Sequence, residues 1–236
     1  MRLMMTLIAD TAQNVDPISA YLANESVNLL GSEQLLDEGA TITEHGDAPA
    51  VVERDVSALR ALWIVDVPSR AAAVELARNA PGGDGALEVR ESFTPQDFGA
   101  PPDPDPPAPP PPPVRKPDTH RYIALIRSHA EEKQPPPTLE STAPMDAYCE
   151  RLVESNTMVG GEGLKPSAKG TRVRRSAAQR FILDGPFTES KELVGGYMIV
   201  QVRTLDEAVD VIRPWLRIHR EVQRVERATI EVRRLL

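Results

Sequence analysis

Apolar and polar residues alternate along several short stretches of the chain, a period of two that is typical of strands with one buried face. In one such stretch Met198, Val200 and Val202 form an apolar face, which we expect to pack on helices. The opposite face is mixed and consists of Tyr197, Ile199, Gln201 and Arg203. A similar mixed face earlier in the chain consists of Leu62, Ile64 and Asp66. A mixed face is typical of a sheet that a second sheet covers, so we expect two facing sheets around a partly wet cleft.

Other stretches repeat every three to four residues, the period of an amphipathic helix. In "APMDAYCERLVESN" the apolar stripe consists of Met145, Tyr148, Cys149, Leu152 and Val153. Pro144 fits the first turn of this helix, where a backbone N–H has no partner in any case. A second helix is expected to open with a capping box from Thr204 to Glu207. Pro214 is expected to end or kink that second helix.

The same pattern of elements occurs twice along the chain. "LWIVDVPSRAAAVELAR" parallels "YMIVQVRTLDEAVDVIR" at one constant offset, which matches Trp63 with Met198. Three shorter parallels join "MMTLIA" to "YIALIR", "QLLDEGATI" to "RLVESNTMV" and "LEVRE" to "IEVRR". Each copy reads β-α-β-β-α-β, the ferredoxin-like order. We therefore interpret the chain as an α+β internal duplication, whose two units pack sheet to sheet as an intramolecular pseudo-dimer shaped like a barrel.

A proline-rich stretch, "GAPPDPDPPAPPPPPVRKPD", separates the two copies at residues 99–118. So many prolines neither complete a sheet nor continue a helix. They favour an extended polyproline II chain at about 3.1 Å per residue, so the stretch reaches on the order of 60 Å. We expect a linker between a first unit at 1–98 and a second at 119–236; a ligand for a PxxP-binding domain is the alternative.

Charge differs sharply between the two units. Residues 1–98 contain 6 Lys or Arg and 16 Asp or Glu, a net charge of −10, whereas residues 118–236 contain 19 and 17, a net charge of +2. Because the two units have net charges of opposite sign, two different units should pair more favourably than two copies of the same unit. The hairpin "TRVRRSAAQRFIL", with its turn expected at 176–179, carries four arginines that we expect to contact the acidic first unit.

Composition excludes several classes of protein. The net charge of −8 and the low aromatic content argue against nucleic acid as a partner. The single cysteine excludes an internal disulfide and favours a reducing compartment. The apolar run in "MRLMMTLIAD" is too short for a signal peptide or a membrane span, so we expect a cytoplasmic protein without a membrane partner.

The second unit carries "ILDGPFTESKELVGGY", preceded by "VGGEGLKP" and "TRV". On these motifs residues 121–236 resemble the YCII-related family in its DGPF branch. The resemblance implies a ferredoxin-like unit that dimerises into an α/β barrel, in bacterial proteins often encoded near extracytoplasmic-function sigma factors. For some relatives it also implies a histidine and an aspartate that act together near the cleft. In the first unit Pro49 to Val52 stand where the DGPF motif stands, and Arg60 and Ala61 replace its double glycine.

Asp184, at the start of the DGPF motif, has two interpretations. A carboxylate before Gly-Pro can fasten the turn through its own side chain. Alternatively Asp184 lies at the rim of the inter-sheet cleft as a general acid or base, or as a ligand anchor whose charge Lys191 neutralises. The remaining residues of the expected ligand site are Phe187, Glu189, Lys191, Gly195, Gly196, Tyr197 and Gln201. The alternatives are a solvated charge run for the charged residues and a β-bulge for the glycines.

The histidines and the cysteine add little further chemistry. His129, just past the first strand of the second unit, is the one histidine that we place near the cleft, as a second catalytic candidate. His45, His120 and His219 are expected at the surface, and Cys149 is expected in the core. No His or Cys pair has metal-ligand spacing and no Walker or nucleophile motif occurs, so we predict neither a metal nor a cofactor.

These observations favour a non-catalytic or regulatory module that binds a small molecule or a protein partner in the cleft of the second unit. The resemblance links such a module to a sigma-factor response. The alternative is a small enzyme that uses Asp184 as a general acid or base on a small organic substrate. A third alternative is an assembly surface, and a higher oligomer is compatible with the sequence. The fold does not decide among them, because it hosts many chemistries.

Overall fold

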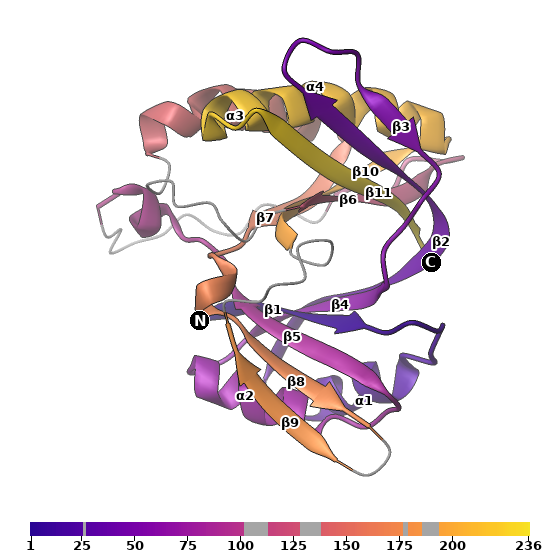
Figure 1. Cartoon of the computed structure of the whole chain (residues 1–236), viewed down its shortest axis with the longest axis vertical. Coiled ribbons are helices and arrows are strands. Elements are labelled where there is room, and N and C mark those ends of the chain that lie inside the picture. The colour runs from indigo at the N-terminus through magenta and orange to yellow at the C-terminus, as the bar shows by residue number, and fades with distance from the viewer. Residues whose placement is uncertain (26, 102–112, 128–137, 177–178, 186–193) are drawn as a thin grey trace.

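The computed structural model describes residues 1–236 apart from 26, 102–112, 128–137, 177–178 and 186–193 (Figure 1). The first unit contains β1 (Arg2–Ile8), α1 (Asp16–Asn24), β2 (Asn28–His45), β3 (Val51–Glu53), β4 (Leu59–Asp66), α2 (Arg70–Asn79) and β5 (Gly85–Glu91). The second unit contains β6 (His120–Arg127), α3 (Leu139–Glu154), β7 (Met158–Gly163), β8 (Thr171–Arg175), β9 (Arg180–Asp184), β10 (Val194–Val202), α4 (Leu205–Gln223) and β11 (Arg227–Leu235). The expected α+β class is confirmed.

All the described strands belong to one antiparallel sheet, in the order β7-β10-β6-β11-β2-β4-β1-β5-β8-β9, with β3 paired to β2. The order β2-β4-β1-β5 in the first unit recurs as β7-β10-β6-β11 in the second. The long strand β2 joins the units, because its beginning pairs with β4 and its remainder with β11. β8 makes the return connection by pairing with β5. Each unit therefore extends its sheet with a strand of the other.

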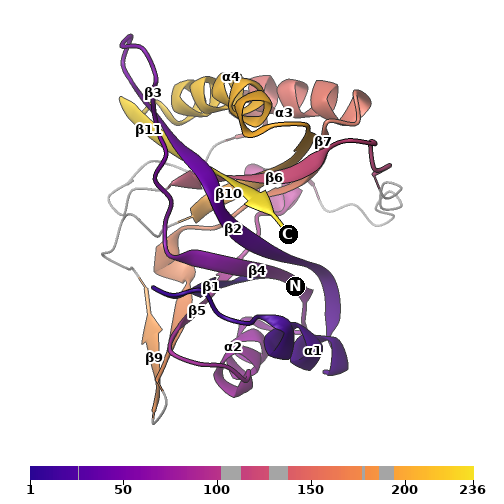
Figure 2. The ribbon, with the colours of Figure 1, turned by 90° about the vertical axis from the view of Figure 1, so that its right-hand side faces the viewer.

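The sheet folds into two layers that face each other, with the helices outside (Figure 1). α3 and α4 cover one layer and α1 and α2 cover the other, as the view turned by 90° also shows (Figure 2). Three apolar clusters fill this arrangement. One contains Trp63 beside α1 and α2, one contains Trp215 of α4, and the third lies between the layers.

The two faces of β10 lie as their alternation predicts. Its apolar face, which includes Met198, packs beneath α4, and its mixed face lies between the layers. The inward apolar side chains from the two units include Leu62, Ile64, Tyr197 and Ile199. All of these are buried, so this part of the interior is packed and not the partly wet cleft that we expected. Buried polar side chains lie instead on the inward faces of β5, β6 and β11.

Some of the sequence parallels between the two units agree with the structure and others do not. Trp63 and Met198 lie in equivalent strands, each facing the helices of its own unit. The parallel of "MMTLIA" with "YIALIR" is wrong by one residue, because Met4 points between the layers whereas Tyr122 packs in the cluster beneath α4. A one-residue slip reverses the faces of a strand. The parallel of "QLLDEGATI" with "RLVESNTMV" is wrong, since the first lies in β2 and the second runs from α3 into β7.

The structure also changes which residues of the β2–β3 hairpin correspond to those of the β8–β9 hairpin. Counting along the ladders from β5 and β11 places Val52 of β3 at the position that Ile182 occupies in β9. Arg54 therefore corresponds to Asp184, and the expected correspondence of Pro49 with Asp184 is wrong. The constant offset fails here because the connection from the hairpin to the next strand is longer in the second unit.

Local details of the helices bear on four expectations, at Pro144, Val153, Pro214 and Thr204. α3 begins earlier than expected, so Pro144 lies inside it, and Val153 is 55% exposed instead of joining the buried stripe. α4 continues beyond Pro214 to residue 223. Thr204 caps α4 by accepting the Glu207 N–H at 3.1 Å, but the Glu207 carboxylate accepts from the preceding backbone N–H of residue 203. Ser176 and Gln179, the ends of the expected hairpin turn, are joined by a hydrogen bond in which the Ser176 N–H donates to the Gln179 carbonyl at 2.9 Å.

Candidate functional site

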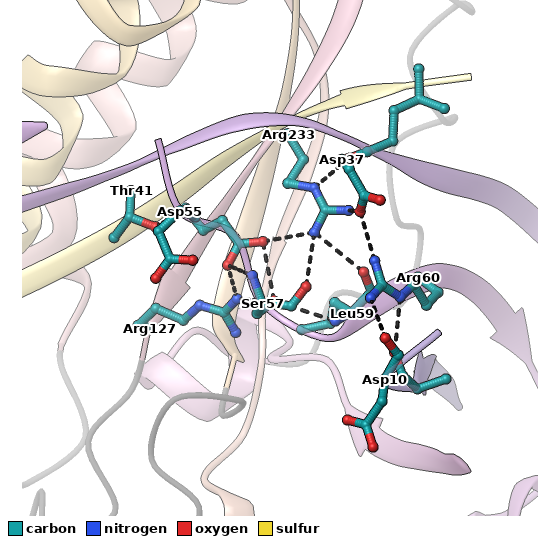
Figure 3. A network of polar contacts seen from close by, with 12 residues as sticks. Asp10, Asp37, Thr41, Asp55, Ser57, Leu59, Arg60, Arg127 and Arg233 are labelled. Atoms are coloured by element: carbon teal, nitrogen blue, oxygen red, sulfur yellow. Dashed lines mark hydrogen bonds and ion pairs between the residues drawn. The ribbon is translucent and has the colours of Figure 1, made fainter. Parts of the chain in front are cut away.

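Arg233, on β11, points between the two layers with 0% of its side chain exposed (Figure 3). Its guanidinium donates to the backbone carbonyl of Leu36 and, at 3.3 Å each, to those of Ser57 and Leu59. All three carbonyls belong to the first unit, whereas Arg233 belongs to the second. Arg233 therefore fastens β2 and the segment that leads into β4 onto β11.

Glu231 lies two residues before Arg233 on the same face of β11. Its carboxylate accepts from Arg233 Nη1, from the N–H and the hydroxyl of Ser57, each at 3.1 Å, and from Arg127 Nη2. Burial raises the pKa of this carboxyl, but Arg127 and Arg233 outweigh burial, so the pKa lies below its ordinary value of 4.5. Both oxygens are occupied by donors, so Glu231 is a fixed anion and not a free proton acceptor.

Arg127 is the member of this network with an unused donor. It ends β6, its side chain is 7% exposed, and its Nη2 donates to Glu231 and to the Ser57 hydroxyl. Its Nη1 is buried and has no hydrogen-bond partner within the described part of the chain. A buried donor without a partner costs about 1–3 kcal/mol, and more on a charged group. The described residues therefore supply no acceptor for this donor.

The network continues outward through Asp37, whose carboxylate lies 2.7 Å from Arg60 and 3.4 Å from Arg233. Arg60 also donates to the Ala9 carbonyl at 2.8 Å. The ionised groups of the network are Arg60, Arg127, Arg233, Asp37 and Glu231. The network therefore carries one more positive than negative charge in a largely buried place, which favours an anion as its complement.

The first unit contributes the same Glu-x-Arg pair to the interior. Glu88 and Arg90 of β5 are both buried, and Arg90 donates to Glu88 and to the Lys165 carbonyl of the second unit, each at 3.0 Å. Glu88 also accepts from Arg172 Nε of β8 at 2.7 Å. The expected contact of the hairpin arginines with the first unit is confirmed for Arg172, Arg175 and Arg180. In each buried pair the arginine thus donates to a backbone carbonyl of the other unit.

Asp184 closes β9, where it accepts from Thr171 Oγ1 at 2.7 Å and from Arg70 Nη2 at 3.2 Å. Arg70 begins α2, so this carboxylate is tied to the first unit. The equivalent hairpin residue in the first unit, Arg54, reaches Asp206 at the start of α4 at 2.8 Å. In the Asp184 pair the hairpin supplies the anion, whereas in the Arg54 pair the hairpin supplies the cation. If each hairpin met the helix of its own unit instead, like charges would face each other, so these pairs favour the observed exchange.

Asp184 does not lie among the inward residues of the interior. It lines a groove of about 470 Å³ between α2 and β9, together with Arg70, Val74 and Ile182. Its side chain is 74% exposed. A second hollow of about 530 Å³ lies between α3 and α4. The structure therefore separates Asp184 from Tyr197, which we expected in the same cleft.

Tyr197 and Gln201 stabilise the fold through burial and through hydrogen bonds to the backbone, respectively. Tyr197 is buried between the layers, and burial raises the pKa of its hydroxyl. The Gln201 amide donates to the carbonyls of Val114 and Asn156 at 2.8 Å each and accepts from the Lys116 N–H at 3.0 Å. Gln201 therefore anchors the end of the proline-rich stretch where it meets β10.

The double glycine allows a close approach of strands. The register shifts between Val194 and Gly196, as expected for a bulge. A Cβ atom on Gly196 would lie 2.9 Å from the Glu162 carbonyl oxygen, so β7 could not pair so closely with a larger residue. The Gly195 carbonyl accepts from the Leu164 N–H at 2.9 Å. The candidates outside the described residues are His129, Phe187, Glu189 and Lys191.

The remaining titratable candidates lie on helices. Cys149 packs against the cluster beneath α4, as predicted, and burial raises the pKa of its thiol to about 11. His219 of α4 is half-buried and not at the surface as expected, and burial lowers its pKa to about 4. Within the described ranges no three His, Cys, Asp or Glu side chains are grouped to hold a metal ion.

No helix in the described part of the chain is both long and apolar enough to cross a membrane.

Sequence reasoning missed Arg127, Glu231 and Arg233 as a set. The available signal was the repeat of "LEVRE" as "IEVRR", in which Glu and Arg stand two positions apart. Such residues point to the same face of a strand, and a charged pair on the inner face of a covered sheet must find partners there.

Residues 121–216 match the YCII-related domain, which is a stretch of the second unit. An uncharacterized protein of Rhizobium meliloti (strain 1021) is 32% identical over 69 residues, which are 29% of this chain and 56% of that relative. The chain therefore spans about half the length of the curated relative that it matches. These likenesses bear out a YCII-related domain in the second unit.

Proposed function

We propose that the protein is a non-catalytic or regulatory binding module of YCII-related type, in the DGPF branch, built by tandem duplication. Its layout is a first unit at 1–98, a linker at 99–118 and a second unit at 119–236. The two units act as the halves of a dimeric α/β barrel within one chain. The repeated strand order and the reciprocal Glu-x-Arg pairs support this arrangement.

The ligand of this module is a small organic anion, held at Arg127. The observation that carries this proposal is the buried Nη1 of Arg127, which has no partner among the described residues. The excess positive charge of the surrounding network supports an anionic ligand, and a guanidinium binds carboxylate or phosphate oxygens well. A bound anion would supply the acceptor that Nη1 lacks and would neutralise the network.

Binding accounts for these residues better than acid–base catalysis does. Glu231 is the carboxylate nearest to Arg127, but donors occupy both of its oxygens. Asp184 is mostly exposed and already holds Arg70. A general base needs a free position within reach of its substrate, and neither carboxylate combines that with burial.

The test measures the binding of acetate, benzoate and inorganic phosphate to the full chain by calorimetry. We expect at least one of these probes to bind, and Arg127→Gln to weaken its binding roughly tenfold to a hundredfold, the worth of one charge-assisted hydrogen bond. Arg234→Gln is the matched control, because Arg234 lies on β11 but pairs with Glu38 outside the network. Absence of binding by the parent, or equal binding by Arg127→Gln, would contradict the proposal.

A further inference from the structure

β9 lies at one end of the strand order, so only one of its two edges pairs with a described strand, which is β8. Figures 1 and 2 show it at the margin of its layer, with no described element along its outer edge. An edge strand presents a row of unpaired N–H and C=O groups to any strand that approaches it. Among the described residues, nothing prevents the outer edge of β9 from pairing with a further strand.

The side chains of β9 are apolar although they are exposed. Phe181, Ile182 and Leu183 are 58%, 50% and 46% exposed, respectively. Natural edge strands are commonly protected by an inward charge, a proline or a bulge, and none of these interrupts the stretch 181–183. At the other end of the order, β7 has mostly half-buried residues, so β9 is the more accessible edge. Three consecutive exposed apolar residues on an edge indicate an interaction surface.

We propose that β9 pairs antiparallel with β9 of a second copy of this chain, with Ile182 on the twofold axis. In this register Phe181 lies opposite Leu183 of the partner subunit, and Arg180 lies opposite Asp184 of the partner subunit. An aromatic residue thus meets an aliphatic one, and a cation meets an anion, on both sides of the axis. The sequence "RFILD" is self-complementary, which favours a second copy over an unrelated strand.

The faces of β9 agree with this register. Ile182 and Asp184 line the groove beside α2, and Arg180 donates to the Arg78 carbonyl of α2, so these three side chains share one face. Phe181 and Leu183 lie on the other face, where the dimer would bury them together. Arg180 of the partner subunit would also reach the Asp184 end of the α2 groove. Five residues make a small interface, so we expect a micromolar dimer and not an obligate one.

The experiment is sedimentation equilibrium of the full chain between about 1 µM and about 500 µM, the range of a small interface. We expect the parent to dimerise and Phe181→Lys or Leu183→Glu to weaken the dimer by about tenfold or more, because each change affects two cross-strand pairs. In the double variant the introduced lysine of one subunit lies opposite the introduced glutamate of the other, on both sides of the axis. We therefore expect the double variant to regain most of the lost affinity.

Val153→Lys is the control, since Val153 is 55% exposed, between Leu183 and Phe181, but lies on α3. Each variant changes an exposed side chain, and an unchanged melting temperature shows that it remains folded. A monomeric parent overturns the proposal and leaves this edge to a different strand. Single variants that dimerise as the parent does, or a double variant no better than the singles, also overturn it. None of these substitutions involves Arg127, so this result is independent of ligand binding.

Discussion

Replacing Arg233 by methionine should destabilise the protein strongly. Methionine keeps an unbranched side chain in the same place but donates to none of the carbonyls of Leu36, Ser57 and Leu59. It also removes a cation beside Glu231 at 3.1 Å, where both side chains are buried. Breaking a buried ion pair by removing one partner costs about 3–5 kcal/mol, a large part of the roughly 5–15 kcal/mol that stabilises a typical domain.

The assay is urea unfolding followed by tryptophan fluorescence, with Arg234→Met as the matched control. Arg234 is the next residue of β11 and pairs with Glu38 at 2.8 Å, but both side chains are substantially exposed. Exposed pairs contribute about 0–1 kcal/mol, so the control should lose little. Equal losses in free energy of unfolding for the two variants would refute the account of Arg233 as a buried connection between the units.

Three further predictions concern single residues. The pKa of Glu231 is lowered in the folded protein, so its contribution to stability is complete above its ordinary pKa of 4.5 and is lost as the pH falls through the folded value. Glu231→Gln should therefore flatten the fall of the free energy of unfolding below pH 4.5, and an unchanged slope would contradict this. Gly39→Ala should cost about 1–3 kcal/mol in urea unfolding, because its Cβ would lie 2.5 Å from the Val232 carbonyl oxygen, whereas Gly31→Ala, with its nearest neighbour at 3.8 Å, should cost much less. Asp184→Asn should change the free energy of unfolding by less than about 1 kcal/mol, because its ion pair is exposed, and a larger loss would show that it fastens the hairpin more firmly than the contacts indicate.

Periodicity predicted α4 and the inward and outward faces of β10, because each depends on local alternation. It missed β7, and both units contain more strands than the expected β-α-β-β-α-β order. The side on which Met198 packs follows from the positions of its apolar neighbours alone. The equivalence of Met4 with Tyr122 depended on a single register choice, and similar apolar residues at adjacent positions make that choice ambiguous. The error at "QLLDEGATI" has a different origin, because one amphipathic stretch is compatible with both a strand and a helix.

The polar interior was less predictable, because its members come from distant parts of the chain. Arg127 of β6 and Glu231 of β11 meet because their strands pair within the second unit, whereas Ser57, which precedes β4, reaches them only through the exchange of strands between the units. A charge count along the sequence indicates that the units attract each other, but it does not say which charges are buried. The pairing of Asp184 with Arg70 likewise depends on the hairpin crossing to the other unit.

We expect the two units to unfold as one cooperative structure, because exchanged strands and buried Glu-x-Arg pairs join them. Each unit has its own tryptophan in its own apolar cluster, Trp63 in the first and Trp215 in the second. Trp63→Phe leaves a reporter of the second unit, and Trp215→Phe leaves a reporter of the first. The measurement compares the urea midpoint from fluorescence with that from far-ultraviolet circular dichroism in each variant. We expect the two midpoints to coincide in both variants, because the two units unfold together; separate transitions for the two units would show that they unfold independently.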